Sequence, residues 1–101
     1  MILEVAILNV KPNRTDQFEK DFRKASQYIS SIKGYVNHTI QKCIEQENQY
    51  ILLVNWEKLE DHTVGFRQSE VYQEWKKLLH DYYDPFPKVE HYKMVFANEK
   101  S

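Results

Sequence analysis

The chain of 101 residues has few of the residues that mark special chemistry or unusual backbone geometry. Its single cysteine, Cys43, cannot form a disulfide within the chain, so a reducing compartment is the simpler expectation. The two glycines, Gly34 and Gly65, are too few for a loop that holds a phosphate through its backbone. The motifs GxGxxG, GxxxxGKS/T, CxxC and HExxH are also missing, which argues against the nucleotide, dithiol and zinc-protease sites that they mark.

Neither sign of charge is in excess, because 14 Lys plus Arg stand against 15 Asp plus Glu. This balance gives no electrostatic reason to expect nucleic acid or an anionic membrane as a partner. No apolar run approaches the roughly 20 residues that a membrane-spanning helix needs. The first ten residues, MILEVAILNV, lack a basic region and include Glu4, so they do not resemble a signal peptide. We therefore expect a cytoplasmic protein.

What the chain does have is aromatic side chains, 14% of its residues, and these predict a packed core. The length predicts one domain over residues 1–101, with a frayed tail at 98–101. Alternation of apolar residues predicts four strands, at residues 2–10, 35–44, 49–57 and 88–97.

Helical spacing predicts a helix between the first two strands, with Phe18, Phe22, Ala25 and Ile29 on its buried face. Gly34 is expected to mark the end of this helix. A short helical segment and a longer helix capped by Ser69 are expected between the last two strands.

This order of elements predicts an α+β fold, the ferredoxin-like βαββαβ arrangement with a four-stranded antiparallel sheet. Helices cover one face of such a sheet, yet the predicted strands are apolar on both faces. No further element is available to cover the second face. A second copy of the chain, packed sheet against sheet, is the economical answer, so we expect a homodimer.

A few polar or amphipathic residues stand out on the apolar faces. Asn9 ends the Leu3-Val5-Ile7 face of the first strand, and Trp56 ends the corresponding face of the third. These strands are neighbours in a ferredoxin-like sheet, and His62 lies on the inward side of the next helical segment. We expect Asn9, Trp56 and His62 to converge on a small-molecule pocket under the helices. The other expected lining residues are Phe22, Phe66, Tyr72 and Trp75.

Plainer structural interpretations remain open for each of these residues. Trp56 suits the core, with its N–H bonded to a carbonyl, and an inward histidine such as His62 is often a satisfied structural residue. Asn9 suits the start of a turn, and the aromatic residues of the second helix suit simple packing. The four histidines show no i, i+3 or i, i+4 spacing, so we expect no metal site; they are His38, His62, His80 and His91.

The most specific pattern in the chain is Trp56-(x5)-His62-(x3)-Phe66-(x2)-Ser69-(x2)-Tyr72. It accompanies the strand ILEVAILNVKP, the Gly34-Tyr35 turn and the strand end LLVNWE. In these features the chain resembles the antibiotic biosynthesis monooxygenase (ABM) domain family over residues 2–97. The resemblance implies a dimeric α+β barrel.

For the better-known members, the resemblance also implies oxygenation without flavin, metal or any other cofactor. A phenol or enol substrate is deprotonated, and the electron-rich anion reduces O2 directly. On this model His62 would accept the proton, since its ordinary pKa of about 6.5 suits neutral pH. Asn9 and the indole N–H of Trp56 would hold the oxyanion.

The family also includes heme-degrading members, which use an asparagine, a tryptophan and a histidine that binds iron. Here Trp75, Lys76 and Lys77 stand where that histidine is expected, His80 comes one turn late, and Phe66 replaces a second tryptophan. Heme degradation is therefore not expected.

Two other functions remain open. One is an isomerase or other proton-transfer enzyme, and Arg67 and Lys93 at its pocket mouth would favour a phosphorylated substrate. The other is a non-catalytic dimer that binds a small ligand.

Overall fold

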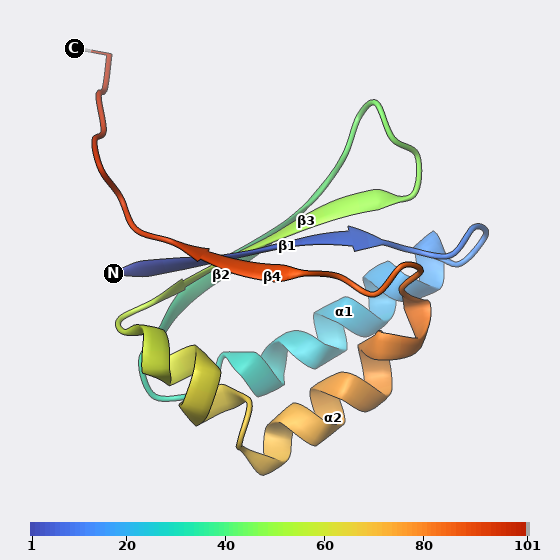
Figure 1. The fold of residues 1–101 in the computed structure, drawn as a ribbon. Helices are drawn as coiled ribbons and strands as arrows, with labels where there is room; N and C mark the ends of the chain where they lie inside the picture. The colour runs from blue at the N-terminus through green and yellow to red at the C-terminus, as the bar shows by residue number, and fades with distance from the viewer. Residues whose placement is uncertain (101) are drawn as a thin grey trace.

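The computed structural model describes residues 1–100 and confirms the ferredoxin-like α+β fold. The strands form one antiparallel sheet in the order β2-β3-β1-β4. The helices lie on one face of this sheet, and the opposite face carries none among the described residues (Figure 1). The elements are β1 (Ile2–Asn9), α1 (Thr15–Ile29), β2 (Tyr35–Lys42), β3 (Gln49–Trp56), η1 (Asp61–Phe66), α2 (Glu70–Leu79), η2 (His80–Tyr82) and β4 (Val89–Tyr92).

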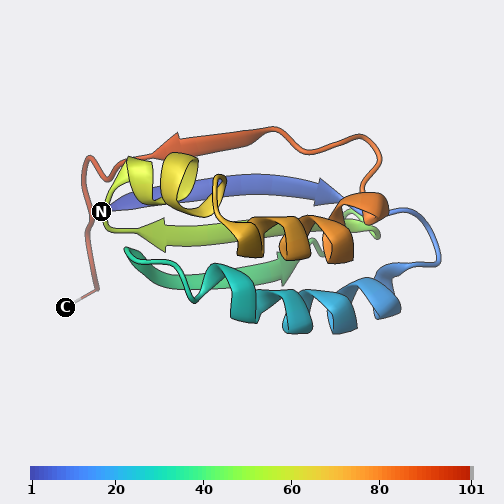
Figure 2. The same ribbon diagram turned by 90° about the horizontal axis from the view of Figure 1, so that it is seen from below.

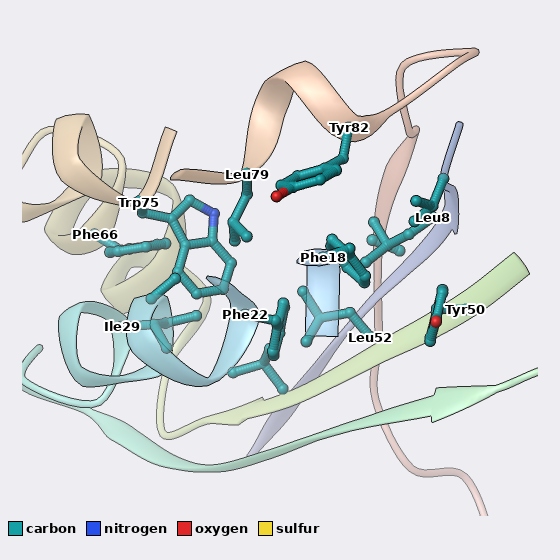
Figure 3. Packing of buried hydrophobic residues seen from close by; sticks show 14 of the residues in the cluster. Leu8, Phe18, Phe22, Ile29, Tyr50, Leu52, Phe66, Trp75, Leu79 and Tyr82 are labelled. Carbon is teal, nitrogen blue, oxygen red and sulfur yellow. The ribbon is translucent and has the colours of Figure 1, made fainter. Parts of the chain in front are cut away.

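The two α-helices lie side by side across the sheet, and η1 lies at the end where β1 begins (Figure 2). The predicted stripe of α1 is confirmed, because Phe18, Phe22, Ala25 and Ile29 are all buried. The core fills the layer between helices and sheet, where Phe22 and Trp75 meet with ring centroids 5.5 Å apart (Figure 3). This layer also contains the site described below.

The face of β1 that we expected to carry the pocket is the wrong one. Glu4, Ala6 and Leu8 point into the helix-covered core, while Ile7 is exposed on the other side. Apolar alternation did not distinguish the two faces, because both are largely apolar. The register distinguishes them: Ala6 is opposite Leu52 of β3, whose inward face was predicted correctly.

The predicted ends of α1 and the last strand also need correction. The helix ends at Ile29, five residues before Gly34, whose positive φ of 91° instead serves the turn into β2. β4 stops at Tyr92 rather than Ala97, because Tyr92 pairs with Leu3 and β1 begins only one residue earlier, at Ile2. Residues 93–100 belong to no strand or helix, and Ser101 lies outside the described residues.

The second long helix begins as predicted. Ser69 caps α2, since its Oγ accepts a hydrogen bond from the backbone N–H of Tyr72 at 3.2 Å. The cap fixes where α2 begins, and so the positions of Tyr72 in its first turn and Trp75 in its second. Across residues 1–100, no helix has both the length and the apolar character that a membrane crossing requires.

Candidate functional site

A cavity of about 380 Å³ lies between the sheet and the segments η1 and α2. Four of the residues predicted for the pocket line it: His62, Phe66, Tyr72 and Trp75. The complete lining is Glu4, Ala6, Leu8, Leu52, His62, Phe66, Arg67, Tyr72, Trp75, His80, Tyr83, Phe86, Pro87 and Val89. Aromatic and aliphatic walls with a few polar groups are typical of small-molecule sites.

The predicted convergence of Asn9 with Trp56 is wrong. The strands β1 and β3 are antiparallel, so Asn9 lies opposite Gln49 while Trp56 lies opposite Ile2. At about 3.3 Å per residue, Asn9 is on the order of 20 Å from the Trp56 end of the sheet. Its side chain also belongs to the uncovered face, so it does not reach the cavity.

Phe22 and Trp56 lie outside the cavity wall. Phe22 is buried in the core and lines a different cleft, together with Phe18 and Tyr50. Trp56 is 0% exposed, and it contacts two polar residues that do line the cavity. Those residues are Glu4 and His62.

Glu4 is the functional candidate that sequence reasoning missed. Its side chain lines the cavity and is only 4% exposed. The indole N–H of Trp56 donates to its Oε1 at 2.9 Å. Burial raises the pKa of Glu4 to about 7, although the Trp56 hydrogen bond and the charge of Arg67 both act to lower it. The sequence did contain the signal, because a lone carboxylate stood at an inward position of an apolar strand.

His62 is placed by η1, a π-helix whose wider turn brings His62 and Phe66 to the same buried side. The imidazole stacks on Trp56, with ring centroids 5.5 Å apart and an interplanar angle of 19°. Burial lowers the pKa of His62 to about 3, and the charges of Arg67 and His91 add to this shift. His62 is therefore neutral near pH 7.

His91 completes the polar cluster from the edge strand. It lies directly opposite Glu4 in the β1–β4 pairing, and its Nε2 is 2.7 Å from Nδ1 of His62. Burial and the charge of Arg67 lower the pKa of His91 as well. Local spacing could not predict this contact, because the two histidines are 29 residues apart in the sequence and only the strand register brings them together.

The contact between Nε2 of His62 and Oε1 of Glu4, at 3.4 Å, is short enough for an ion pair. The pKa shifts argue against one, because burial disfavours the charged form of both groups. We therefore describe the contact as one between a neutral imidazole and a carboxyl group that titrates near pH 7. In the described residues, no cluster of three or more histidine, cysteine or acidic side chains is arranged to hold a metal ion.

The cavity is polar at one end and apolar at the other. Glu4, His62 and Arg67 gather where β1 begins, and the Arg67 charge acts on both of the other groups. Leu8 lies further along β1, and Tyr83 lies beyond it, because Tyr83 bridges to Val10. Phe86 packs close to Tyr83 at this second end and is largely exposed to solvent.

Fold and site together define a small ferredoxin-like α+β protein whose aromatic cavity contains a buried carboxyl–imidazole contact. Residues 1–78 match the family model described as antibiotic biosynthesis monooxygenase. The chain therefore belongs to the antibiotic biosynthesis monooxygenase family, as the resemblance in its sequence implied.

The chain is also similar to individual proteins in sequence and in structure. The uncharacterized protein YczJ of Bacillus subtilis (strain 168) is 53% identical over 95 residues, which span 94% of this chain and 100% of that protein. A putative antibiotic biosynthesis monooxygenase from Bordetella bronchiseptica superposes with a TM-score of 0.89 at 34% identity, covering 94% of this chain and 97% of the other.

A more distant structural relative is a single-residue mutant of SnoaB from Streptomyces nogalater, described as a cofactor-independent oxygenase. It shares the fold with a TM-score of 0.82, at 13% identity and with 98% and 97% of the two chains covered.

Proposed function

We propose that this protein is a cofactor-independent monooxygenase that deprotonates a small phenol or enol and lets the resulting anion react with O2. The observation that carries the proposal is the Glu4 carboxyl, which is only 4% exposed in the wall of an aromatic cavity, where burial raises its pKa to about 7. A fold shared with SnoaB, a cofactor-independent oxygenase, supports the same reaction class.

The proposed reaction balances without a cofactor. Glu4 removes a proton from the substrate, and the anion transfers electrons to O2 as a carbon–oxygen bond forms. The peroxide intermediate then loses water, so one oxygen atom stays on the oxidised carbon. The other oxygen leaves as water with one hydrogen from this carbon and one proton taken up from solvent, which replaces the hydroxyl proton that Glu4 removed. The substrate itself is the reductant.

The roles that we propose differ from those expected from the sequence. The neutral His62 is a weak proton acceptor, because burial holds its pKa near 3, whereas Glu4 has a pKa suited to proton transfer at pH 7. The indole N–H of Trp56 already donates to Glu4 and is not free for an oxyanion. Arg67 is the remaining group suited to stabilise a substrate anion, since it lines the cavity and forms no ion pair within residues 1–100.

The cavity also suggests the shape of the substrate. Glu4, Ala6 and Leu8 line it in succession along β1, a distance of about 13 Å at 3.3 Å per residue. We propose that the acidic group of the substrate lies beside Glu4, with its apolar part directed toward Leu8 and Phe86. Hydroquinones and 4-alkylphenols have this shape.

The test is oxygen consumption by purified protein that has been dialysed against a chelator and contains no flavin. We expect protein-dependent O2 uptake with a hydroquinone or 4-alkylphenol panel, and faster uptake when an alkyl chain occupies the apolar end. The same substrates should be stable under anaerobic conditions. A panel that gives no protein-dependent uptake would contradict the oxygenase. Turnover at the same rate with and without air, with solvent deuterium entering the product, would instead support an isomerase that uses the same base.

We further propose that the active protein is a homodimer, in which a second copy covers the open face of the sheet. An apolar groove on this side is lined by Met1, Leu3 and Tyr92 together with Met94, Val95 and Phe96 of the segment after β4. All of these except Leu3 are exposed in the single chain, and the segment runs away from the helices (Figure 1). A patch of this kind usually marks an interface. A cytoplasmic location remains part of the proposal, supported by the single cysteine.

For the dimer, we expect light scattering after size exclusion to give twice the chain mass for the wild type. Val95→Asp should shift the protein toward the monomer, because a carboxylate would be buried in an apolar contact. Val64→Asp is the matched control, since Val64 is exposed on η1, on the helix-covered side of the sheet. A wild-type monomer at micromolar concentration would overturn this proposal.

A further inference from the structure

The polar cluster connects the inside of the cavity to the edge of the sheet. Glu4 and His62 both line the cavity, and His91 lies on the edge strand β4 with part of its side chain exposed. The two links are the 3.4 Å contact from Glu4 Oε1 to His62 Nε2 and the 2.7 Å contact from His62 Nδ1 to His91 Nε2. From this geometry we propose that Glu4, His62 and His91 form a proton relay that carries the substrate proton from the cavity to solvent.

The relay follows from how a neutral imidazole shares its single N–H. If Glu4 is ionised, His62 carries its proton on Nε2 and donates to the carboxylate, while Nδ1 accepts from the Nε2–H of His91. If Glu4 is protonated, its O–H donates to Nε2 of His62, and the imidazole carries its proton on Nδ1 and donates to His91. The tautomer of His62 therefore depends on the protonation state of Glu4.

One relay step moves a proton without creating a buried charge on either imidazole at the end of the step. The protonated Glu4 gives its proton to Nε2 of His62, Nδ1 of His62 gives one to Nε2 of His91, and His91 releases its Nδ1 proton to water. Glu4 is then ionised again and His62 has returned to the Nε2–H tautomer. The 3.4 Å contact must shorten during transfer, as catalytic hydrogen bonds commonly do once substrate is bound.

A separate exit is needed because Glu4 is almost completely buried. A substrate that fills the cavity would cover its inner side, so the accepted proton could not return to water that way. The other groups facing the cluster are poor acceptors. Trp56 and Arg67 have only N–H donors, and burial raises the pKa of Tyr72.

The first experiment uses 15N-labelled histidine in the protein without substrate. NMR should show His62 with its proton on Nδ1 at pH 5.5 and on Nε2 at pH 8.5, whereas Glu4→Gln should show one tautomer throughout. A His62 tautomer that stays the same in the wild type over this range would overturn the relay.

The second experiment measures how fast the ring proton of His62 exchanges with solvent. His91→Gln keeps an N–H donor facing His62 but cannot pass a proton on, so we expect exchange to slow by about tenfold or more. Added imidazole should restore the rate by substituting for His91. His80→Gln, at the other end of the same cavity, is the matched control and should exchange like the wild type. Exchange in His91→Gln as fast as in the wild type would exclude the relay.

The relay rests on the proposed function, because it takes Glu4 as the acceptor of the substrate proton. The two proposals can nevertheless fail separately. Oxygen uptake by a protein in which the His62 tautomer does not change with pH would support the oxygenase and contradict the relay. A switching tautomer in a protein that consumes no oxygen with any substrate would support the relay and contradict the oxygenase.

Discussion

Glu4→Gln is expected to lower the rate of protein-dependent O2 uptake by a factor of about 10² to 10⁴, the usual contribution of a general base. The substitution preserves shape, and the Gln oxygen still accepts the hydrogen bond that Trp56 donates to Oε1. It removes only the ability to take up a proton. Substrate binding should therefore change far less than turnover, so the loss should appear in kcat rather than in KM.

The same substitution should stabilise the protein at alkaline pH. Burial raises the pKa of Glu4 in the folded state to about 7 from an ordinary 4.5, so the folded protein binds more protons than the unfolded chain between these values. The contribution of Glu4 to stability is fully present below pH 4.5 and is lost as pH rises to 7. Glu4→Gln escapes this loss, so its stability advantage should grow with pH to at most about 3 kcal/mol above pH 7.

Denaturant unfolding at pH 5 and pH 8 measures this effect. The contribution of His62 to stability depends on pH in the opposite direction. Because its pKa is lowered in the folded state, the protein loses stability as pH falls below about 6.5. That contribution is common to both proteins, so their difference isolates Glu4. Glu90→Gln is the control, since Glu90 is exposed on β4. Full activity in Glu4→Gln, or a stability difference that does not depend on pH, would show that Glu4 is not the base.

The sequence was sufficient for the fold because its signals there are local and redundant. The stripe of Phe18 and Phe22, the Ser69 cap and the alternation ending at Trp56 each define an element without reference to the others. The β4 boundary failed because the end of an edge strand depends on how far its neighbour extends, and the sequence of β4 itself does not contain that information.

The site was less predictable because it depends on register. His62 was found from its position before Phe66, but the choice of Asn9 assumed that two neighbouring strands end on the same side. In an antiparallel pair the end of one strand lies beside the start of the other, which separates Asn9 from Trp56 and brings Glu4 near it. An inward carboxylate in an apolar strand was the better signal, since burial of an acid is costly and is seldom found without a partner.

Trp56 is expected to show the largest stability effect of any residue in the site. Its side chain is 0% exposed and contacts both His62 and Phe66, so Trp56→Ala should destabilise the fold by about 3 to 5 kcal/mol through the cavity that it leaves. Loss of the indole donor to the buried Glu4 adds to this cost. Thermal and denaturant unfolding measure the effect, and Tyr72→Ala, at a less buried position in the cavity wall, should cost less.

Trp56→Phe separates the packing role from the electrostatic one. Phenylalanine keeps much of the ring that stacks on His62 but has no N–H for Glu4. The Trp56 hydrogen bond acts to lower the pKa of Glu4, so its removal should raise that pKa further above its present value of about 7. The pH at which turnover reaches half its maximum should then move upward. Trp75→Phe, which alters the cavity wall and leaves this hydrogen bond intact, should not change the midpoint. An unchanged midpoint in Trp56→Phe would mean that another group accepts the proton.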